Sequence, residues 1–160
     1  PFRIKIVGRT KNCINTFGEE LMVDNTDTAI SNSCKKYNCS ITEYTVAPIF
    51  INKKSGGHQW FIEFEKKPLE LQSFMKEIDN QIKHLNSDYE AKRYNNLILK
   101  FPELTVIENN EFYLWLKENN RLGGQYKIPR LSENREIAEK IMSIKRSFQQ
   151  NSLLTPNNDN

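Results

Sequence analysis

Two neighbouring segments rich in β-branched and aromatic residues place the strongest limit on how this chain can fold. They occupy residues 40–52 and 58–64, and apolar residues fill every second position of the latter. Alternation with a period of two is typical of a strand with one buried face. The sequence Lys-Ser-Gly-Gly at 54–57 lies between them, and no Lys-Ser or Lys-Thr pair follows it as in a phosphate-binding loop. We therefore expect an antiparallel hairpin that turns at Gly56 and Gly57.

Helical periodicity occupies much of the remaining chain. Apolar residues recur at every third or fourth position after Pro68, which predicts a helix over residues 69–85. Further helices are expected over about 25–37, 88–93, 110–116 and 132–144, and further strands over 2–7, 97–107 and a short hairpin at 13–23. A few strands, mostly antiparallel, with helices packed on them define an α+β fold with a small sheet.

Size and composition indicate a single globular domain. The chain has 160 residues, of which 38% are hydrophobic and 27% charged. No apolar run reaches membrane-spanning length, and the basic residues behind the net charge of +3 are interleaved with acidic ones. We expect a cytoplasmic protein with no membrane and no nucleic-acid partner. The chain opens at Pro1 inside an alternating run, so we interpret it as a fragment with a domain at 1–148 and a disordered, Asn-rich tail at 149–160.

Cysteine and histidine are few and poorly spaced for metal binding. Cys13, Cys34 and Cys39 lack the two-residue spacing of a zinc knuckle, and His58 and His84 stand alone in the sequence. We expect thiols in a reducing compartment and no metal site. Charged residues dominate the segment 88–93, for which a capped surface helix with internal ion pairs is the favoured interpretation. The residues expected in the core are Trp60, Phe61, Phe112 and Trp115.

Two polar clusters, more than a hundred residues apart, are the candidates for chemistry. Gly8 ends a predicted strand, and Arg9 and Lys11 follow in the turn, where paired cations suit a polyanion such as a nucleotide phosphate. The second cluster, Gly-Gly-Gln-Tyr-Lys-Ile-Pro-Arg at 123–130, is a glycine loop that presents Lys127. Taken alone, Lys127 is also compatible with an ordinary surface lysine after the end of a helix.

Three segments in order resemble the Gretchen Hagen (auxin-responsive promoter) family of acyl-acid amido synthetases, in its bacterial branch. They are the run 2–20 with Gly-Arg-Thr-Lys and Phe-Gly-Glu, the segment 86–93, and the loop 124–131. The resemblance covers roughly residues 1–146. It implies the mobile carboxy-terminal cap domain of an adenylate-forming enzyme, with the protein's own large amino-terminal domain as its partner. It also implies ATP and Mg²⁺, bound mainly by that domain, and acyl-acid and amino-acid substrates.

The resemblance also implies roles for individual residues. Lys127 would be the catalytic cation that stabilises charge at the α-phosphate, and Arg9 and Lys11 would bind nucleotide or act at the hinge. The supporting loop and turn residues would be Gly18, Glu19, Gly123, Gly124, Gln125 and Tyr126. For Glu19 a salt bridge within the hairpin is an equal alternative. Related ligases often have Asp where this chain has Asn12, so assistance from a charge there is not expected.

Two other functions are compatible with the same residues. A cap domain of an acyl-CoA ligase shares the Gly-Arg-x-Lys and Gly-Glu turns, although the segment 86–93 favours the amido synthetases. A non-catalytic α+β interaction module would have a basic turn without chemistry. A comparison of CoA with amino acids as acceptors separates the first from an amido synthetase. The reading frame upstream of Pro1 tests the second.

Overall fold

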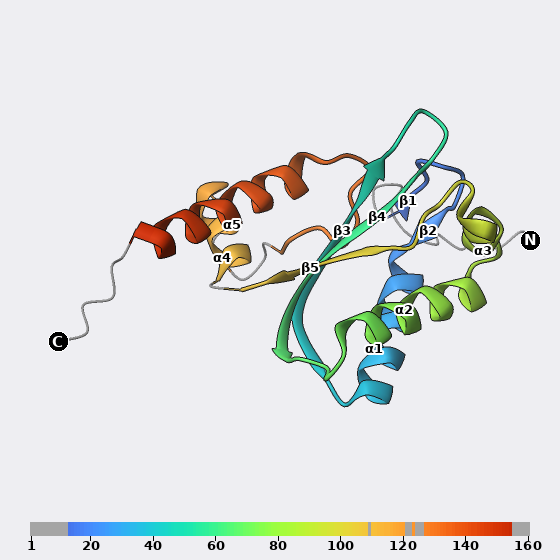
Figure 1. Ribbon diagram of the computed structural model, residues 1–160, viewed down its shortest axis with the longest axis horizontal. Coiled ribbons are helices and arrows are strands. Elements are labelled where there is room, and N and C mark those ends of the chain that lie inside the picture. Colours follow the sequence, from blue (N-terminus) through green and yellow to red (C-terminus); the bar gives the residue numbers. More distant parts are fainter. Residues whose placement is uncertain (1–12, 109, 121–122, 124–126, 155–160) are drawn as a thin grey trace, which may run out of the picture.

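The computed structural model describes residues 13–108, 110–120, 123 and 127–154, so the strand predicted at 2–7 lies outside the described residues. The predicted α+β class is confirmed: a three-stranded sheet lies between helices on its two faces (Figure 1). In chain order the elements are β1 (Cys13–Ile14), β2 (Leu21–Met22), α1 (Val23–Tyr37), β3 (Ser40–Phe50), β4 (Gly56–Lys66), α2 (Leu71–Leu85), α3 (Ser87–Arg93), the 3-10 turn η1 (Tyr94–Asn96), β5 (Glu103–Ile107), α4 (Glu111–Glu118) and α5 (Glu136–Leu154).

The central sheet has the order β3-β4-β5 and is mixed. The predicted hairpin of β3 and β4 is confirmed, and its antiparallel register pairs Phe50 with Gly56. β5 instead pairs with β4 in parallel, with Gln59 opposite Glu103. The strand character predicted for 97–107 therefore divides at Pro102: only the residues after it form a strand, and Leu99 makes a single parallel bridge to Gly56.

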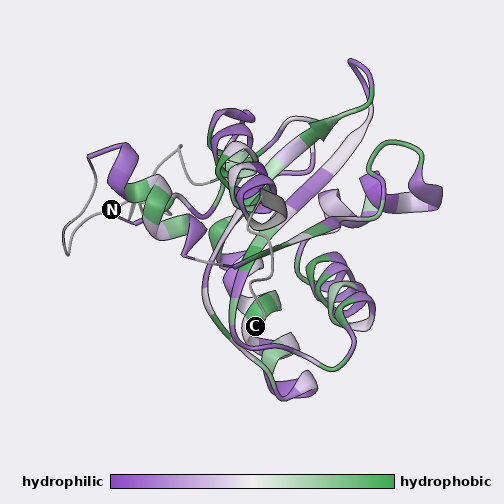
Figure 2. Ribbon diagram, turned by 60° about the vertical axis from the view of Figure 1, so that its left-hand side comes forward, coloured by the Kyte–Doolittle hydropathy of each residue, from purple (hydrophilic) through white to green (hydrophobic). Residues whose placement is uncertain are grey.

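The position of the hairpin turn differs from the prediction. Gly56 and Gly57 are the first residues of β4, and the reversal lies before them at 51–55, where the Asn52 side chain accepts hydrogen bonds from the Lys54 and Ser55 amides. The reason for glycine is close approach rather than turn geometry. A Cβ at Gly56 would lie 1.8 Å from the Ile49 carbonyl oxygen and 2.4 Å from the Phe17 ring. Figure 2 shows the hairpin tip as hydrophilic, with hydrophobic residues flanking it.

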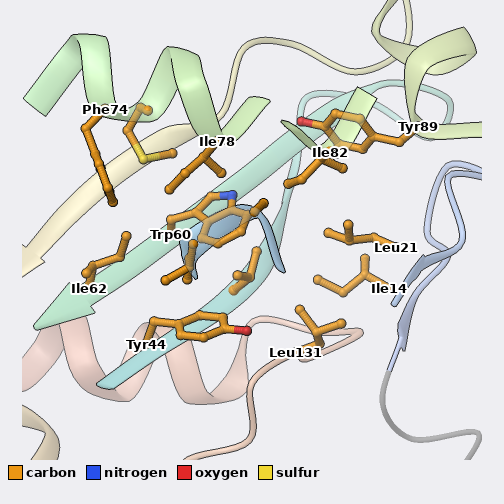
Figure 3. Packing of buried hydrophobic residues seen from close by; sticks show 14 of the residues in the cluster. Ile14, Leu21, Tyr44, Trp60, Ile62, Phe74, Ile78, Ile82, Tyr89 and Leu131 are labelled. Carbon is orange, nitrogen blue, oxygen red and sulfur yellow. The ribbon is translucent and has the colours of Figure 1, made fainter. Parts of the chain in front are cut away.

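Each face of the sheet carries its own hydrophobic core, and the strand alternation decides which side chain enters which core. Trp60 and Ile62 of β4 face α1, α2 and the β1–β2 hairpin, where Phe74 and Ile78 meet them (Figure 3). Phe61 faces the opposite way, toward α4 and α5. The four aromatic residues expected in the core are all buried: Trp60, Phe61, Phe112 and Trp115.

The helices follow the predicted segments with shifted ends. α1 ends at Asn38, whose left-handed φ of 49° is tolerated by asparagine, and the Cys39 amide donates to the Cys34 carbonyl at 3.1 Å. α3 is capped by Asn86, whose side chain accepts from the Tyr89 amide. α5 runs to Leu154, beyond the predicted boundary at 148. Within the described residues, no helix combines the length and apolar character needed to cross a membrane.

The three cysteines form no disulfide in the described part of the chain. Cys34 and Cys39 flank the end of α1. Burial raises the pKa of the Cys39 thiol to about 12, and the neighbouring Cys34 thiol adds to this shift. Burial also raises the pKa of Cys34. Both thiols are therefore protonated at neutral pH and behave as packing groups rather than nucleophiles.

Candidate functional site

The exit of the glycine loop is fixed to the free edge of β3. The Val46 amide donates to the Arg130 carbonyl at 2.9 Å, and the Ser132 amide donates to the Val46 carbonyl at 3.0 Å. The Thr45 hydroxyl donates to the Pro129 carbonyl at 2.6 Å. These bonds make residues 128–132 a short parallel addition to the sheet, centred on the bridge between Val46 and Leu131. Lys127 lies immediately before this anchored segment.

Lys127 itself is exposed, as is Gly123 at the start of the loop. Gly123 has φ of 150°, which glycine adopts far more readily than other residues. Lys127 is thus an accessible cation whose chain is held firmly on its carboxyl side. Gly124, Gln125 and Tyr126 lie outside the described residues.

The anchored segment contacts both cores. Ile128 enters the core beneath α4 and α5, whereas Leu131 enters the opposite core, near Ile14 and Leu21 of the β1–β2 hairpin (Figure 3). The hairpin follows the first polar cluster in the chain, and the Ile14 and Leu21 contacts bring it beside the exit of the second cluster. Arg9 and Lys11 of the first cluster lie outside the described residues.

The Arg130 side chain is held by acidic and aromatic partners. Its guanidinium lies 4.5 Å from the centroid of the Tyr44 ring and forms an ion pair with Glu43. Its Nε is 3.8 Å from an Asp27 carboxylate oxygen in the first turns of α1. The Tyr44 hydroxyl donates to that same oxygen at 2.6 Å. Burial raises the pKa of Tyr44, and the hydrogen bond to Asp27 raises it further, so the phenol stays protonated.

A buried hydrogen bond between a carboxyl group and an imidazole supports the turn of the β1–β2 hairpin. Gly18 is exposed at φ of 82°, in the left-handed region that favours glycine. Glu19 is fully buried, accepts from the Phe17 amide at 2.6 Å and pairs with His58 Nε2 at 2.8 Å. The alternative of a Glu19 salt bridge within the hairpin is therefore wrong, because the partner of Glu19 is His58 of β4. Gly18 is therefore open to another molecule at this turn, whereas the carboxylate of Glu19 is not.

His58 is not the isolated residue that the sequence indicates. It occupies the same inward face of β4 as Trp60 and Ile62, so the alternation of this strand already places it inside. A buried imidazole needs a polar partner, and Glu19 supplies it. The missed signal is this position in the alternation, because the partner lies 39 residues away in the chain.

The prediction of a surface helix with internal ion pairs at 88–93 is wrong for two of its residues. Tyr89 and Arg93 are buried, and both bind Asp79 of α2: the Tyr89 hydroxyl donates at 2.8 Å and Arg93 Nε at 2.7 Å. The Tyr89 ring stacks on His58 with centroids 5.9 Å apart. This network holds α3 against α2 and β4, and Lys92 of α3 lies beside Gly18, close to where a Cβ would stand. The charged segment 88–93 therefore supports the turn that contains Gly18.

Acidic pH is expected to weaken this network. Burial alone raises the pKa of Asp79, but the hydrogen bonds and charges of Arg93 and Lys83 outweigh it and hold the pKa below its usual value of 3.8. A carboxyl whose pKa is depressed by folding stabilises the fold above its unfolded pKa, and this contribution disappears as the pH falls through the folded pKa. The free energy of unfolding of the wild type should exceed that of Asp79→Asn at pH 7, and the difference should shrink below about pH 4. Urea unfolding of both proteins across this range measures it. A difference that stays constant down to pH 2.5 would contradict the assignment.

Two pockets lie away from those predicted site residues that the structure describes. One of about 280 Å³ lies between α4 and α5, lined in part by Leu114 and Phe148, and one of about 420 Å³ lies between α2 and the start of β5. Neither is lined by Gly18, Gly123 or Lys127. In the described part of the chain, no group of three or more His, Cys, Asp or Glu residues could hold a metal ion. Within the described residues, the predicted site comprises the exposed Gly18 and Gly123 and the exposed side chain of Lys127.

Comparisons with known proteins agree with this architecture. Residues 24–136 match the family described as GH3 family C-terminal domain, a range that contains Lys127 and Arg130 but not Gly18 or Glu19. Two solved structures, "GH3.15 acyl acid amido synthetase" and "AtGH3.15 acyl acid amido synthetase in complex with 2,4-DB", each superimpose with a TM-score of 0.67 at 18% identity over 86% of this chain. The chain spans 26% of each of those proteins. No curated protein matches the sequence.

Proposed function

Because the chain belongs to the GH3 family, whose C-terminal domain it forms, we propose that it is the cap domain of an ATP-dependent acyl-acid amido synthetase. In the first half-reaction an oxygen of the substrate carboxylate bonds to the α-phosphorus of ATP, the bond from that phosphorus to the bridging oxygen breaks, and pyrophosphate leaves. In the second, an amine nitrogen bonds to the acyl carbon, AMP leaves, and the nitrogen loses a proton. The cap includes α5 as far as Leu154 and acts with a larger domain of the same polypeptide.

The exposed Lys127 on its anchored loop is the observation that carries this proposal. Negative charge accumulates on the phosphoryl oxygens and the departing pyrophosphate during adenylation, and a lysine presents a compact positive charge to them. Lys127 is accessible, and its carboxyl-side neighbours are bonded to β3. A lysine that must enter the pocket of another domain needs both an exposed side chain and a backbone that is held in place.

Gly18 is the second functional element of the proposal. Its exposed backbone has no side chain to obstruct a substrate, and the Glu19–His58 pair holds the turn from beneath. We propose that Gly18 lies next to the amine substrate during the second half-reaction. Mg²⁺ would neutralise phosphate charge, and the resemblance implies that it is bound mainly by the larger domain. The resemblance of the loop and turn segments supports a bacterial, cytoplasmic enzyme.

Replacing Lys127 with alanine tests the proposal. In the polypeptide that carries both domains, Lys127→Ala is expected to slow acid-dependent ATP–pyrophosphate exchange by about 10²- to 10³-fold, because an interaction made mainly in the transition state is lost. The matched control is Lys53→Ala at the exposed hairpin tip, which should leave exchange unchanged. Normal exchange by Lys127→Ala would reject the role.

The identity of the acceptor separates the two classes of ligase. With an active acid, release of AMP should increase on addition of amino acids and not on addition of CoA. Stimulation by CoA alone would replace the amido synthetase with an acyl-CoA ligase.

A further inference from the structure

Arg130 ends the loop motif, and its chemistry at first suggests a second phosphate ligand. The structure gives the guanidinium other partners. It forms the ion pair with Glu43, approaches Asp27 at 3.8 Å, lies over the Tyr44 ring at 4.5 Å and contacts the Tyr44 carbonyl at 3.4 Å. Two carboxylates already neutralise this charge, so a phosphate would have to displace them. The arrangement suits a residue that holds the protein chain rather than a ligand.

The contacts of Arg130 join three separate parts of the domain. Its backbone carbonyl is bonded to Val46 of β3, its side chain pairs with Glu43 of the same strand, and Asp27 belongs to α1. Asp27 is in turn fixed by the Tyr44 hydroxyl at 2.6 Å. The side chain is 33% exposed, so the clamp lies at the surface where the loop leaves the domain. This geometry controls the direction of the loop at its exit.

Only Ile128 and Pro129 separate this clamp from Lys127. Three residues of extended chain span at most about 10 Å, and Pro129 has a restricted φ. Ile128 is buried and Pro129 is bonded through its carbonyl to Thr45. Because the intervening chain is short and restrained, a displacement of Arg130 also displaces Lys127. Misplacing a catalytic group by about 1 Å can reduce a rate about 10²-fold.

We propose that Arg130 is a positioning residue for Lys127: clamped by Glu43, Asp27 and the Tyr44 ring, it sets where the lysine enters the active site. This inference rests on the proposed function. It assigns no substrate contact to Arg130, so the residue matters to adenylation only while Lys127 is present. The expected signature is a lower kcat for exchange with little change in the KM for ATP, since ground-state binding of ATP belongs to the other domain.

The test is a double-mutant cycle in the polypeptide that carries both domains. Arg130→Met keeps the length and much of the apolar stem but removes the guanidinium. It should lower the rate of ATP–pyrophosphate exchange about 10- to 100-fold in the wild-type background and less than about 3-fold in the Lys127→Ala background. Glu43→Gln, which loosens the clamp from the opposite partner, should show the same dependence on Lys127 with a smaller loss. Arg130→Lys retains the charge without the planar stack and should recover part of the rate.

Different outcomes overturn different statements. If Arg130→Met lowers exchange equally in both backgrounds, it acts on substrate or on the fold and not through Lys127, and the inference is wrong. If Lys127→Ala is impaired while Arg130→Met is normal, only the positioning role fails. If Lys127→Ala exchanges at the wild-type rate, the catalytic role of Lys127 fails, and the positioning role with it. Absence of acid-dependent exchange by the wild type would instead overturn the proposed function. Thermal unfolding midpoints of all variants show whether any loss of rate follows from loss of folded protein.

Discussion

Asp79→Ala is expected to destabilise the domain by about 3–5 kcal/mol, because it leaves a buried arginine without its counter-charge. Asp79 and Arg93 have side chains only 2% and 5% exposed. Their contact is bidentate, with Arg93 Nε at 2.7 Å and Nη2 at 3.0 Å from the two carboxylate oxygens. The change also removes the acceptor of the Tyr89 hydroxyl. Urea or guanidinium unfolding at neutral pH measures the loss as a lower midpoint with an unchanged slope.

Two further variants distinguish the buried pair from a general effect of losing a carboxylate. Asp88→Ala removes an exposed acidic residue from the first turn of α3 and should cost less than about 1 kcal/mol. The double variant Asp79→Ala, Arg93→Met should be more stable than Asp79→Ala alone, because it removes the unpaired charge as well. A loss below about 1 kcal/mol for Asp79→Ala would show that water or another group replaces the carboxylate.

Gly56→Ala is expected to cost about 3 kcal/mol, the upper end for inserting a methyl group into a packed site. The added Cβ would meet the Ile49 carbonyl oxygen at 1.8 Å, and backbone cannot rotate away as a flexible side chain can. Gly56 is also bonded on both sides, from its amide to the Ile98 carbonyl and from the Lys100 amide to its carbonyl. The strand must therefore shift, and the β3–β4 pairing and the start of the β5 connection shift with it. Thermal and chemical unfolding measure the loss.

The adjacent glycine provides the matched control. A Cβ at Gly57 would find its nearest neighbour, the Lys100 carbonyl oxygen, at 3.7 Å, an ordinary contact distance. Gly57→Ala should therefore change stability by less than about 1 kcal/mol, since the lower entropy of the unfolded chain offsets small adjustments. Equal losses at the two positions would mean that both glycines act through backbone conformation rather than through space.

The sequence predicts those elements of the fold whose signal is local. The alternation of β4 and the helical spacing of α2 predict both elements, and Trp60 and Phe61 of β4 are buried as expected. The parallel pairing of β5 was not predicted, because the partner of a strand depends on the crossover and not on the strand's own residues. The glycines at 56 and 57 show the same limit. A Gly-Gly pair indicates a turn, whereas position 56 requires glycine because the Ile49 carbonyl oxygen on the opposite strand leaves no room for a Cβ.

The candidate site divides in the same way. The exposure of Lys127 and Gly18 follows from their polar, glycine-containing segments. The contacts that hold these segments in place do not follow from the local sequence. Glu19 pairs with His58, which lies 39 residues away, and Arg130 contacts residues 87 and 103 positions before it in the chain. Charged residues in a short helix such as α3 ordinarily face solvent. Arg93 can be buried because Asp79 on the neighbouring helix neutralises its charge and Asn96 and the Leu99 carbonyl accept further hydrogen bonds.

The attachment of residues 128–132 to β3 has a consequence for how the molecule behaves among its own copies. β3 is an outer strand of the sheet, and an outer strand with free amides and carbonyls is a template for pairing with another chain. The bonds of Val46 to Arg130 and Ser132 occupy the middle of that edge. The same short segment that orients the loop thus protects the protein from intermolecular sheet growth. Selection against aggregation would preserve this attachment even in a relative that no longer needed the lysine.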